Sequence, residues 1–397
     1  MNAMRVAYLT HYAELYGANR SLLELIGELQ RRGVVEPHVL LPMEGPLVAE
    51  LERMRIPFRI IPFEMRLARR DHSGGLHHRL MQRVRYAREA RGRGRRNEER
   101  LPAMIDQVKA WRAVLVHANS SAVSIARDLA SEASLPLVWH IRELLLSHYG
   151  FHPDRGRSEH GHALRDADRL IGISEAVRED VLRYTSLVRP LTVIYNGVLP
   201  KARYAELRAS SAQRWTVGGP FVFAMVGLIH HSKGHMEALE AVRLLLDRGA
   251  DVRLVIAGGG RSDAVRERIR ELRLEGHVEL TGFVPDVFSV YDRSHALLMC
   301  SRSEAMGRVT VEAMASGLPV IAHASGGTVE LVRDGVDGHL YSSGVDDLVP
   351  LMAGLVADRG GAQRMGEQAS LGAEARFTVE ASADAVWALY RDLLSSR

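Results

Sequence analysis

The sequence predicts an α/β fold with two parallel sheets, each covered by helices. Apolar runs typical of buried strands alternate with helical segments through almost all of the 397 residues. Such alternation is characteristic of parallel strands joined by crossover helices. The alternation ends at the turn residues 196–200 and starts again, after a polar stretch, with the apolar run 221–227. We therefore expect two similar α/β halves joined by a short linker, with a ligand-binding cleft between them.

The first half contains seven short apolar segments of the length expected for strands. They are residues 4–10, 38–42, 58–63, 113–119, 137–141, 169–174 and 191–196. A helix is expected after the first strand, because Leu22, Leu25 and Leu29 recur at helical spacing. Ser21 and Glu24 have the spacing of a capping box, which predicts that this helix begins at Ser21.

The second half repeats the pattern of the first. Its strand candidates are residues 221–227, 252–260, 277–283, 295–300 and 318–323. After them, apolar residues from position 377 onward repeat at three and four, which predicts a C-terminal helix. We expect an N-terminal domain of residues 1–198, a second domain of residues 199–375, and a terminal helix of residues 376–397 that packs back on the first domain.

Composition narrows the class of protein. An apolar content of 46% and a charged content of 25% are typical of a soluble globular protein. Cys300 is the only cysteine, which excludes an intrachain disulfide and a zinc site made of thiolates. The N-terminus leads directly into a strand, and no apolar run approaches the roughly 18 residues of a membrane span. A cytoplasmic location fits best, with any membrane contact made from the surface.

Most of the positive charge is concentrated in one insertion. Residues 64–100 contain 12 Arg, no Lys and 5 acidic residues, so the rest of the chain is slightly acidic. One interpretation is a solvated insertion or a polar helix face. Another is a basic amphipathic helix over residues 80–90 that lies on an anionic membrane surface. Nucleic-acid binding is not expected, because interleaved stacking aromatics are missing.

Glu304 and Glu312 stand eight residues apart where a predicted strand leads into a helix. The apolar run 295–300 predicts the strand, and apolar residues at helical spacing up to Gly317 predict the helix. Glu304 then lies in the loop outside the carboxyl end of the strand, where ligands bind in open α/β sheets. Gly307 is expected at the helix start, where free backbone N–H groups favour an anion. The segment predicts a phosphate-binding site flanked by two carboxylates.

Several segments together resemble the retaining glycosyltransferases of family 4. They are GANRSLLEL near the start, the strand carrying His140, IGISEAVRED, VIYNGV, the loop 227–234, TGFVPD, and the Glu-x7-Glu segment followed by GLPVIA and GGTVE. One Glu-x7-Glu pair has little specificity, whereas these elements in the family's order are specific. The resemblance implies the GT-B architecture, with two facing Rossmann-like domains. It also implies a nucleoside diphosphate sugar donor of the UDP or GDP type, and we expect neither a metal nor a cofactor.

The resemblance implies roles for four residues in particular. Glu312 matches the glutamate that bonds the ribose hydroxyls, and Glu304 matches the one that faces the transferred sugar. Lys233 matches the lysine that neutralises the diphosphate and stabilises the leaving group. His140 matches a histidine that touches the donor sugar from the N-terminal domain, and a structural histidine is the alternative.

The same motifs imply further donor-binding positions. Gly17 is where the first loop approaches the donor phosphate, and Phe283 and Val284 are at the base pocket. A third group, next to the distal phosphate and sugar, consists of Met306, Gly307, Arg308, Val309 and Thr310. Leu228 departs from the family, which usually has an arginine there. Neutralisation of the diphosphate then rests on Lys233 or is shared with Arg308, His230 or His231.

Other functions remain open from the sequence. Asp166 and Asp168 have the spacing of a metal-binding DxD motif of a different glycosyltransferase fold, but they precede a predicted strand, and no metal site is expected there. The rivals to a glycosyltransferase are a nucleotide-sugar epimerase of the same fold and a non-catalytic nucleotide-sugar-binding protein. The acceptor is expected to be a growing polysaccharide, a lipid-linked saccharide or a small molecule such as a secondary metabolite.

Overall fold

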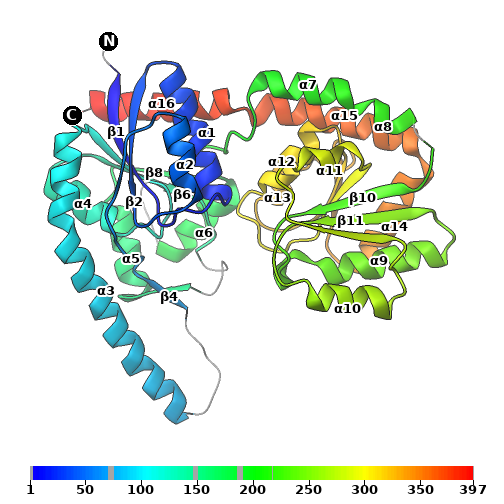
Figure 1. Cartoon of the computed structure of the whole chain (residues 1–397), viewed down its shortest axis with the longest axis horizontal. Helices are drawn as coiled ribbons and strands as arrows, with labels where there is room; N and C mark the ends of the chain where they lie inside the picture. Colours follow the sequence, from blue (N-terminus) through cyan, green and yellow to red (C-terminus); the bar gives the residue numbers. More distant parts are fainter. Residues whose placement is uncertain (1–2, 70–75, 146–150, 186–190, 217, 397) are drawn as a thin grey trace. The chain divides into compact units, whose positions relative to one another are not determined.

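A computed structural model describes residues 3–69, 76–145, 151–185, 191–216 and 218–396 (Figure 1). The chain forms two compact units, one of Met1–Gly197 together with Val379–Arg397, and one of Val198–Thr378. Each unit has its own parallel sheet and its own hydrophobic core.

The first unit has a seven-stranded parallel sheet in the order β3-β2-β1-β5-β6-β8-β9. Its strands are β1 (Met4–Leu9), β2 (Val35–Leu41), β3 (Phe58–Ile60), β5 (Leu115–Ala118), β6 (Leu137–Ile141), β8 (Arg169–Gly172) and β9 (Leu191–Val193). A separate antiparallel pair joins β4 (Leu67–Arg69) to β7 (Phe151–Pro153). The helices are α1 (Gly17–Arg31), α2 (Pro46–Arg53), α3 (Leu76–Ala110), α4 (Ile125–Ala133), α5 (Gly156–Arg165), α6 (Glu175–Thr185) and α16 (Val379–Ser395).

The second unit has a six-stranded parallel sheet in the order β12-β11-β10-β13-β14-β15. Its strands are β10 (Phe221–Val226), β11 (Val252–Ala257), β12 (Val278–Gly282), β13 (Ala296–Met299), β14 (Val320–His323) and β15 (Gly338–Tyr341). Its helical segments are α7 (Lys201–Ser211), α8 (Gln213–Thr216), the 3-10 turn η1 (His231–Lys233), α9 (His235–Asp247), α10 (Asp263–Glu271), α11 (Phe288–Asp292), α12 (Arg308–Ala315), α13 (Thr328–Leu331), α14 (Val345–Ala357) and α15 (Arg359–Arg376).

Both sheets are doubly wound, because the chain builds one side of the sheet and then crosses to the other. The strand order reverses between β1 and β5 in the first unit and between β10 and β13 in the second. Each predicted strand overlaps a strand of the structure, although β2 begins at Val35, three residues before its predicted start, and β4, β7 and β15 were not predicted. Ligands of such sheets bind at the carboxyl ends of the strands where the order reverses.

The predicted start of the first helix is wrong. Helix α1 begins at Gly17, so Ser21 lies inside the helix, and no side chain caps the N-terminus. The reason is Asn19, whose buried amide donates to the carbonyls of Tyr12 and Glu14. These bonds hold the loop before the helix and allow the helix to begin earlier.

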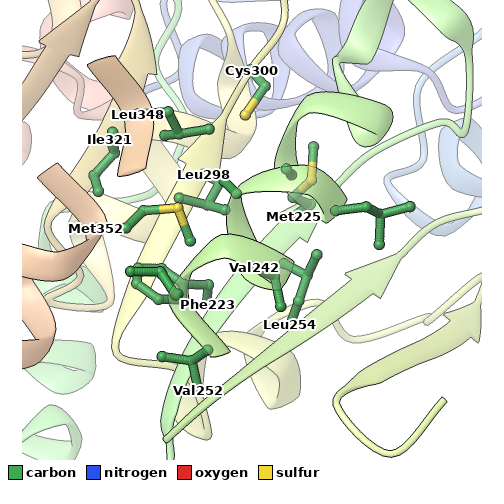
Figure 2. Packing of buried hydrophobic residues seen from close by; sticks show 14 of the residues in the cluster. Phe223, Met225, Val242, Val252, Leu254, Leu298, Cys300, Ile321, Leu348 and Met352 are labelled. Carbon is green, nitrogen blue, oxygen red and sulfur yellow. The ribbon is translucent and has the colours of Figure 1, made fainter. Parts of the chain in front are cut away.

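The two cores are separate. In the first unit, Val386 and Tyr390 of α16 belong to the same cluster as Leu22 and Ile26 of α1, and α16 lies along α1 (Figure 1). The C-terminal helix therefore packs on the first unit. In the second unit, side chains of β10, β11, β13 and β14 meet those of α9 and α14 (Figure 2).

The arginine-rich insertion is mainly helical. Helix α3 covers 35 residues and continues past the insertion to Ala110. Residues 70–75 of the insertion lie outside the described residues. Across the part of the chain that the structure describes, none of the helices combines the length and apolar character needed to cross a membrane.

Candidate functional site

Two of the predicted site residues follow adjacent strands at the strand-order reversal of the second unit. Lys233 is in the turn η1 after β10, and Glu304 is in the loop after β13. Gly234 has φ +73, and a Cβ at this position would lie 2.5 Å from the Cys300 carbonyl oxygen. Only glycine allows the turn to approach the end of β13 this closely, and this approach places Lys233 beside the Glu304 loop.

Lys233 and Glu304 form an ion pair. The Lys233 Nζ donates to Glu304 Oε1, and the two side chains are 28% and 17% exposed. The Glu304 backbone is fixed by the loop after β14, because its carbonyl accepts a hydrogen bond from the Gly327 N–H at 2.8 Å. A Cβ at Gly326 would lie 2.4 Å from that same carbonyl oxygen. The glycine pair after β14 therefore permits the loop geometry that presents Glu304.

Glu312 lies on α12 and is nearly buried. Arg308 Nη2 is 3.5 Å from Glu312 Oε1, and the Tyr291 hydroxyl donates to Glu312 Oε2 at 3.5 Å. Burial raises the pKa of Tyr291 well above its usual value, and the nearby Glu312 carboxylate raises it further. Tyr291 is therefore a permanent hydrogen-bond donor, and its single proton is shared between the Glu312 carboxylate and the Val309 carbonyl, which is closer at 3.3 Å.

The N-terminus of α12 carries the next predicted residues. Gly307 is the N-cap with φ +92, and no side chain caps the helix. Met306 and Thr310 are buried and Val309 is half-buried. The Thr310 N–H donates to the Gly307 carbonyl at 3.1 Å, and within the described residues the buried Thr310 hydroxyl has no hydrogen-bond partner. The start of a helix is suited to meet an anion.

A small pocket opens at the same edge of the second sheet. Its lining includes Gly227 and Leu228 after β10, Lys233 in η1, and Ser301 after β13. Leu228, which stands where the family usually has an arginine, is more than half exposed and supplies no charge. Among these four residues, Lys233 is the only cation.

Phe283 and Val284 are farther along the second sheet than Lys233. Phe283 directly follows β12 and is 71% exposed, and Val284 is half-buried. His230 and His231 are at the turn η1 beside Lys233, with their tilted rings 4.0 Å apart between centroids, and His230 bonds the Ser232 hydroxyl at 2.9 Å. An exposed phenylalanine offers a flat apolar surface to a ligand.

The first unit carries Gly17 and His140. Gly17 is the exposed first residue of α1. His140 is the penultimate residue of β6, is 1% exposed, and its Nδ1 is 3.3 Å from Arg142 Nη2. Burial lowers the pKa of His140 well below its usual value, and Arg142 and His117 lower it further. The imidazole is therefore neutral, and within the described residues its Nε2 has no hydrogen-bond partner.

Sequence reasoning missed the polar network around His140. The buried Arg142 guanidinium donates to Asn119 Oδ1 at 2.6 Å and to Asn196 Oδ1. These residues follow β6, β5 and β9, so one guanidinium connects three strand ends. The His117 ring packs edge-on against the His140 ring, with 5.4 Å between the centroids. The Nδ1 of His117 bonds the Tyr390 hydroxyl of α16 at 2.6 Å. The only sequence signal was the position of each polar residue at the end of an apolar run.

The DxD spacing does not correspond to a cluster of metal ligands. Asp168 Oδ2 accepts from the Leu137 N–H at 2.8 Å, and Asp166 pairs with Arg127. Among the residues described by the structure, no group of three or more His, Cys, Asp or Glu side chains is arranged to hold a metal ion. Both aspartates lie in the turn before β8, and each is bonded to a residue elsewhere in the first unit.

Solved structures share this fold along the whole chain. HepE of Anabaena in complex with UDP has a TM-score of 0.77 at 20% identity, covering 99% of this chain and 100% of its own. A glycosyltransferase from Rickettsia africae has a TM-score of 0.75 at 17% identity, covering both chains completely. The two Rossmann-like sheets therefore define the GT-B fold.

Family models match both halves of the chain. Residues 16–201 match the model described as Glycosyltransferase Family 4, and residues 209–371 match the model described as Glycosyl transferases group 1. With the fold, these matches show that the chain is of the glycosyltransferase family 1/4 type.

Curated relatives carry the names of several transferases. The chain is 27% identical over 240 residues to alpha-D-kanosaminyltransferase of Streptomyces kanamyceticus, covering 58% of this chain and 62% of that protein. It is 36% identical over 180 residues to D-inositol 3-phosphate glycosyltransferase of Mycobacterium marinum, covering 43% of this chain and 38% of that protein. The chain thus spans less than two thirds of the length of these relatives.

Proposed function

We propose that the protein is a retaining, metal-independent glycosyltransferase that uses a nucleoside diphosphate sugar of the UDP or GDP type. The observation that carries the proposal is the convergence of Lys233, Glu304 and the α12 N-terminus beside one pocket at the strand-order reversal. A cation and a helix N-terminus suit a diphosphate, and carboxylates suit sugar hydroxyls.

Each residue has a chemical task in this proposal. Lys233 and the α12 N-terminus bind the diphosphate and stabilise the charge that accumulates on the leaving group. Glu312 accepts hydrogen bonds from the ribose hydroxyls. Glu304 faces the sugar, where a carboxylate favours an oxocarbenium-like centre. Because the Arg308 guanidinium faces Glu312, we assign diphosphate neutralisation principally to Lys233.

We assign acceptor binding to the first unit. His140, to which the family resemblance gives contact with the donor sugar, supplies a buried, neutral imidazole near the end of β6. The names of the relatives, which include D-inositol 3-phosphate glycosyltransferase and 2-deoxystreptamine glucosyltransferase, support a polyhydroxylated ring as acceptor. A polysaccharide or lipid-linked saccharide has the same hydroxyl chemistry. A cytoplasmic location follows from the donor, and a lipid-linked acceptor would bring the protein to the inner face of the membrane.

A panel of UDP- and GDP-sugars tests the proposal directly. A bound donor stabilises the folded protein by mass action, by about 2.7 kcal/mol at a concentration of 100 Kd, and therefore raises the unfolding temperature. UDP-glucose is the first donor to try, since HepE, which has the same fold, was solved with it. Mass spectrometry then follows transfer to inositol, aminocyclitol and saccharide acceptors. Glu304→Gln should bind the donor and lose transfer, whereas Glu267→Gln on the exposed side of α10 should keep both.

Two other experimental outcomes would contradict the proposed transfer reaction. A nucleotide-sugar epimerase would convert the donor to an isomer without an acceptor and without hydrolysis. A binding protein would show the same thermal stabilisation with no product, and its biological activity would survive Glu304→Gln. Either result would leave the donor-binding assignment of Glu312 intact and reject the transfer reaction.

A further inference from the structure

Helix α3 has one face fixed against the first unit. Asn97 is buried and bonds the Glu64 backbone in both directions, at 2.8 Å to the N–H and 2.9 Å to the carbonyl. Arg93 makes two bonds to Asp154, at 2.6 and 2.8 Å. Since Met104 is also fully buried, these contacts determine which face of the helix points inward and which points outward.

The outward face of the N-terminal half is basic and partly apolar. Met81 and Val84 are 61% and 64% exposed, although both are apolar. At helical spacing beyond them come exposed arginines. The outer face is defined as Met81, Val84, Arg85, Arg88, Arg91 and Arg95.

The charge of this face is only partly neutralised by the protein. Between residues 81 and 95 there are six arginines and one acid, Glu89. Of these arginines, Arg93 is the one that turns inward to an aspartate within the part of the chain that the structure describes. Within the described residues, Arg88 and Arg91 form no ion pair. Arg85 and Arg95 pair only with exposed glutamates one turn further along the same helix. Such exposed pairs contribute little and are readily exchanged for another anion.

The helix has the dimensions of an extended docking surface. Its 35 residues span about 50 Å, and its N-terminal half runs beyond the parallel sheet of the first unit (Figure 1). Guanidinium groups bind phosphate oxygens in a bidentate manner, and exposed Met and Val side chains enter the headgroup boundary of a bilayer. A single-stranded nucleic acid would require exposed stacking aromatics, and the aromatic residue of this stretch, Tyr86, is half-buried.

We propose that the outer face of α3 docks the protein on an anionic phospholipid bilayer. The arginines meet lipid phosphates, and Met81 and Val84 insert into the headgroup region. The electrostatic attraction between the helix and an anionic bilayer increases with each basic residue near the surface, and salt weakens it. This inference stands whether or not the proposed transfer reaction is correct, because it concerns a different surface and is tested without a donor.

The test is vesicle co-sedimentation of the full chain. Vesicles of phosphatidylglycerol and phosphatidylcholine should bind the protein at least tenfold more tightly than vesicles of phosphatidylcholine alone. The binding should weaken as sodium chloride is raised above about 0.15 M. The double substitution Arg88→Glu with Arg91→Glu should reduce binding to the anionic vesicles at least tenfold. Val84→Ser, which leaves the charge unchanged, should reduce the binding that persists at high salt.

A matched control separates this face from net charge. Arg266→Glu with Arg270→Glu on α10 changes the net charge equally at exposed arginines of the second unit, and should leave vesicle binding nearly unchanged. If the double substitution on α3 lowers the unfolding temperature, Arg88→Gln with Arg91→Gln replaces it. Equal binding of the α3 and α10 variants, equal binding to both vesicle types, or binding of single-stranded RNA in place of vesicles would overturn the proposal.

Discussion

Lys233 and Glu304, which are 71 residues apart in the chain, form a direct ion pair at the strand-order reversal of the second sheet. The pair occupies both groups before any ligand arrives. In the proposed function, a diphosphate bound at Lys233 competes with the Glu304 carboxylate for this ammonium group or shares its three N–H donors. The ion pair holds the lysine in position.

Glu304→Gln should separate donor binding from turnover. Removal of the carboxylate charge frees Lys233, so UDP should bind as tightly as in the native protein or more tightly, by roughly one- to fivefold. Transfer should fall by about 10²- to 10³-fold, because the charge that faces the sugar is lost. Calorimetry with UDP and initial rates with the active donor measure the two effects. A parallel loss of UDP affinity would contradict the competition between Glu304 and the diphosphate.

The strands of this fold could be predicted because each is a short apolar run with a turn residue behind it. The small strand β15 was missed because it begins with Gly338 and carries the polar His339, so it lacks an apolar run. Glu304 and Glu312 were found because they are close in the sequence. The contacts of Lys233 with Glu304 and of Arg142 with Asn196 could not be found, since they depend on which strands become neighbours.

Glu312→Ala should remove discrimination at the ribose. The native carboxylate, held by Tyr291 and Arg308, is placed to accept from two vicinal hydroxyls. The native protein should therefore prefer UDP to 2′-deoxy-UDP by about tenfold or more, and the variant should bind both with similar, weaker affinity. Tyr291→Phe should have an intermediate effect on this preference, because the substitution leaves the Glu312 carboxylate in place but removes one of its hydrogen bonds. An unchanged preference in Glu312→Ala would place the ribose elsewhere.

Gly234→Ala and Gly249→Ala form a matched pair for the backbone beside Lys233. Their φ angles are +73 and +80, so both substitutions carry a similar conformational cost of about 1–2 kcal/mol. A Cβ at Gly249 meets nothing within 4 Å, whereas one at Gly234 lies 2.5 Å from the Cys300 backbone oxygen. Gly234→Ala should therefore cost about 3 kcal/mol or more in urea denaturation. It should also lose UDP affinity by displacing Lys233, and equal costs for the two variants would show that the turn relaxes freely.

The buried His117 should make the first unit sensitive to acid. Burial lowers the pKa of His117 to about 3, with Arg142 contributing, against an ordinary value of 6.5. Between these values the unfolded chain binds a proton that the folded chain does not. Stability is therefore complete above about pH 6.5 and falls as the pH drops toward 3, by up to about 1.4 kcal/mol per pH unit for this histidine.

Substitutions of His117 and of its partner Tyr390 test the acid sensitivity. His117→Gln should reduce the pH dependence of urea denaturation below pH 6.5 by about one proton. Tyr390→Phe leaves the buried His117 Nδ1 without its 2.6 Å partner, so it should cost about 1–3 kcal/mol at neutral pH. Tryptophan fluorescence reports mainly on this unit, because Trp111, Trp139 and Trp387 belong to it. If His117→Gln leaves the pH dependence as it was, His117 is not the acid-sensitive group. Burial also lowers the pKa values of four other histidines of this unit, which would then account for the effect: His11, His38, His140 and His160.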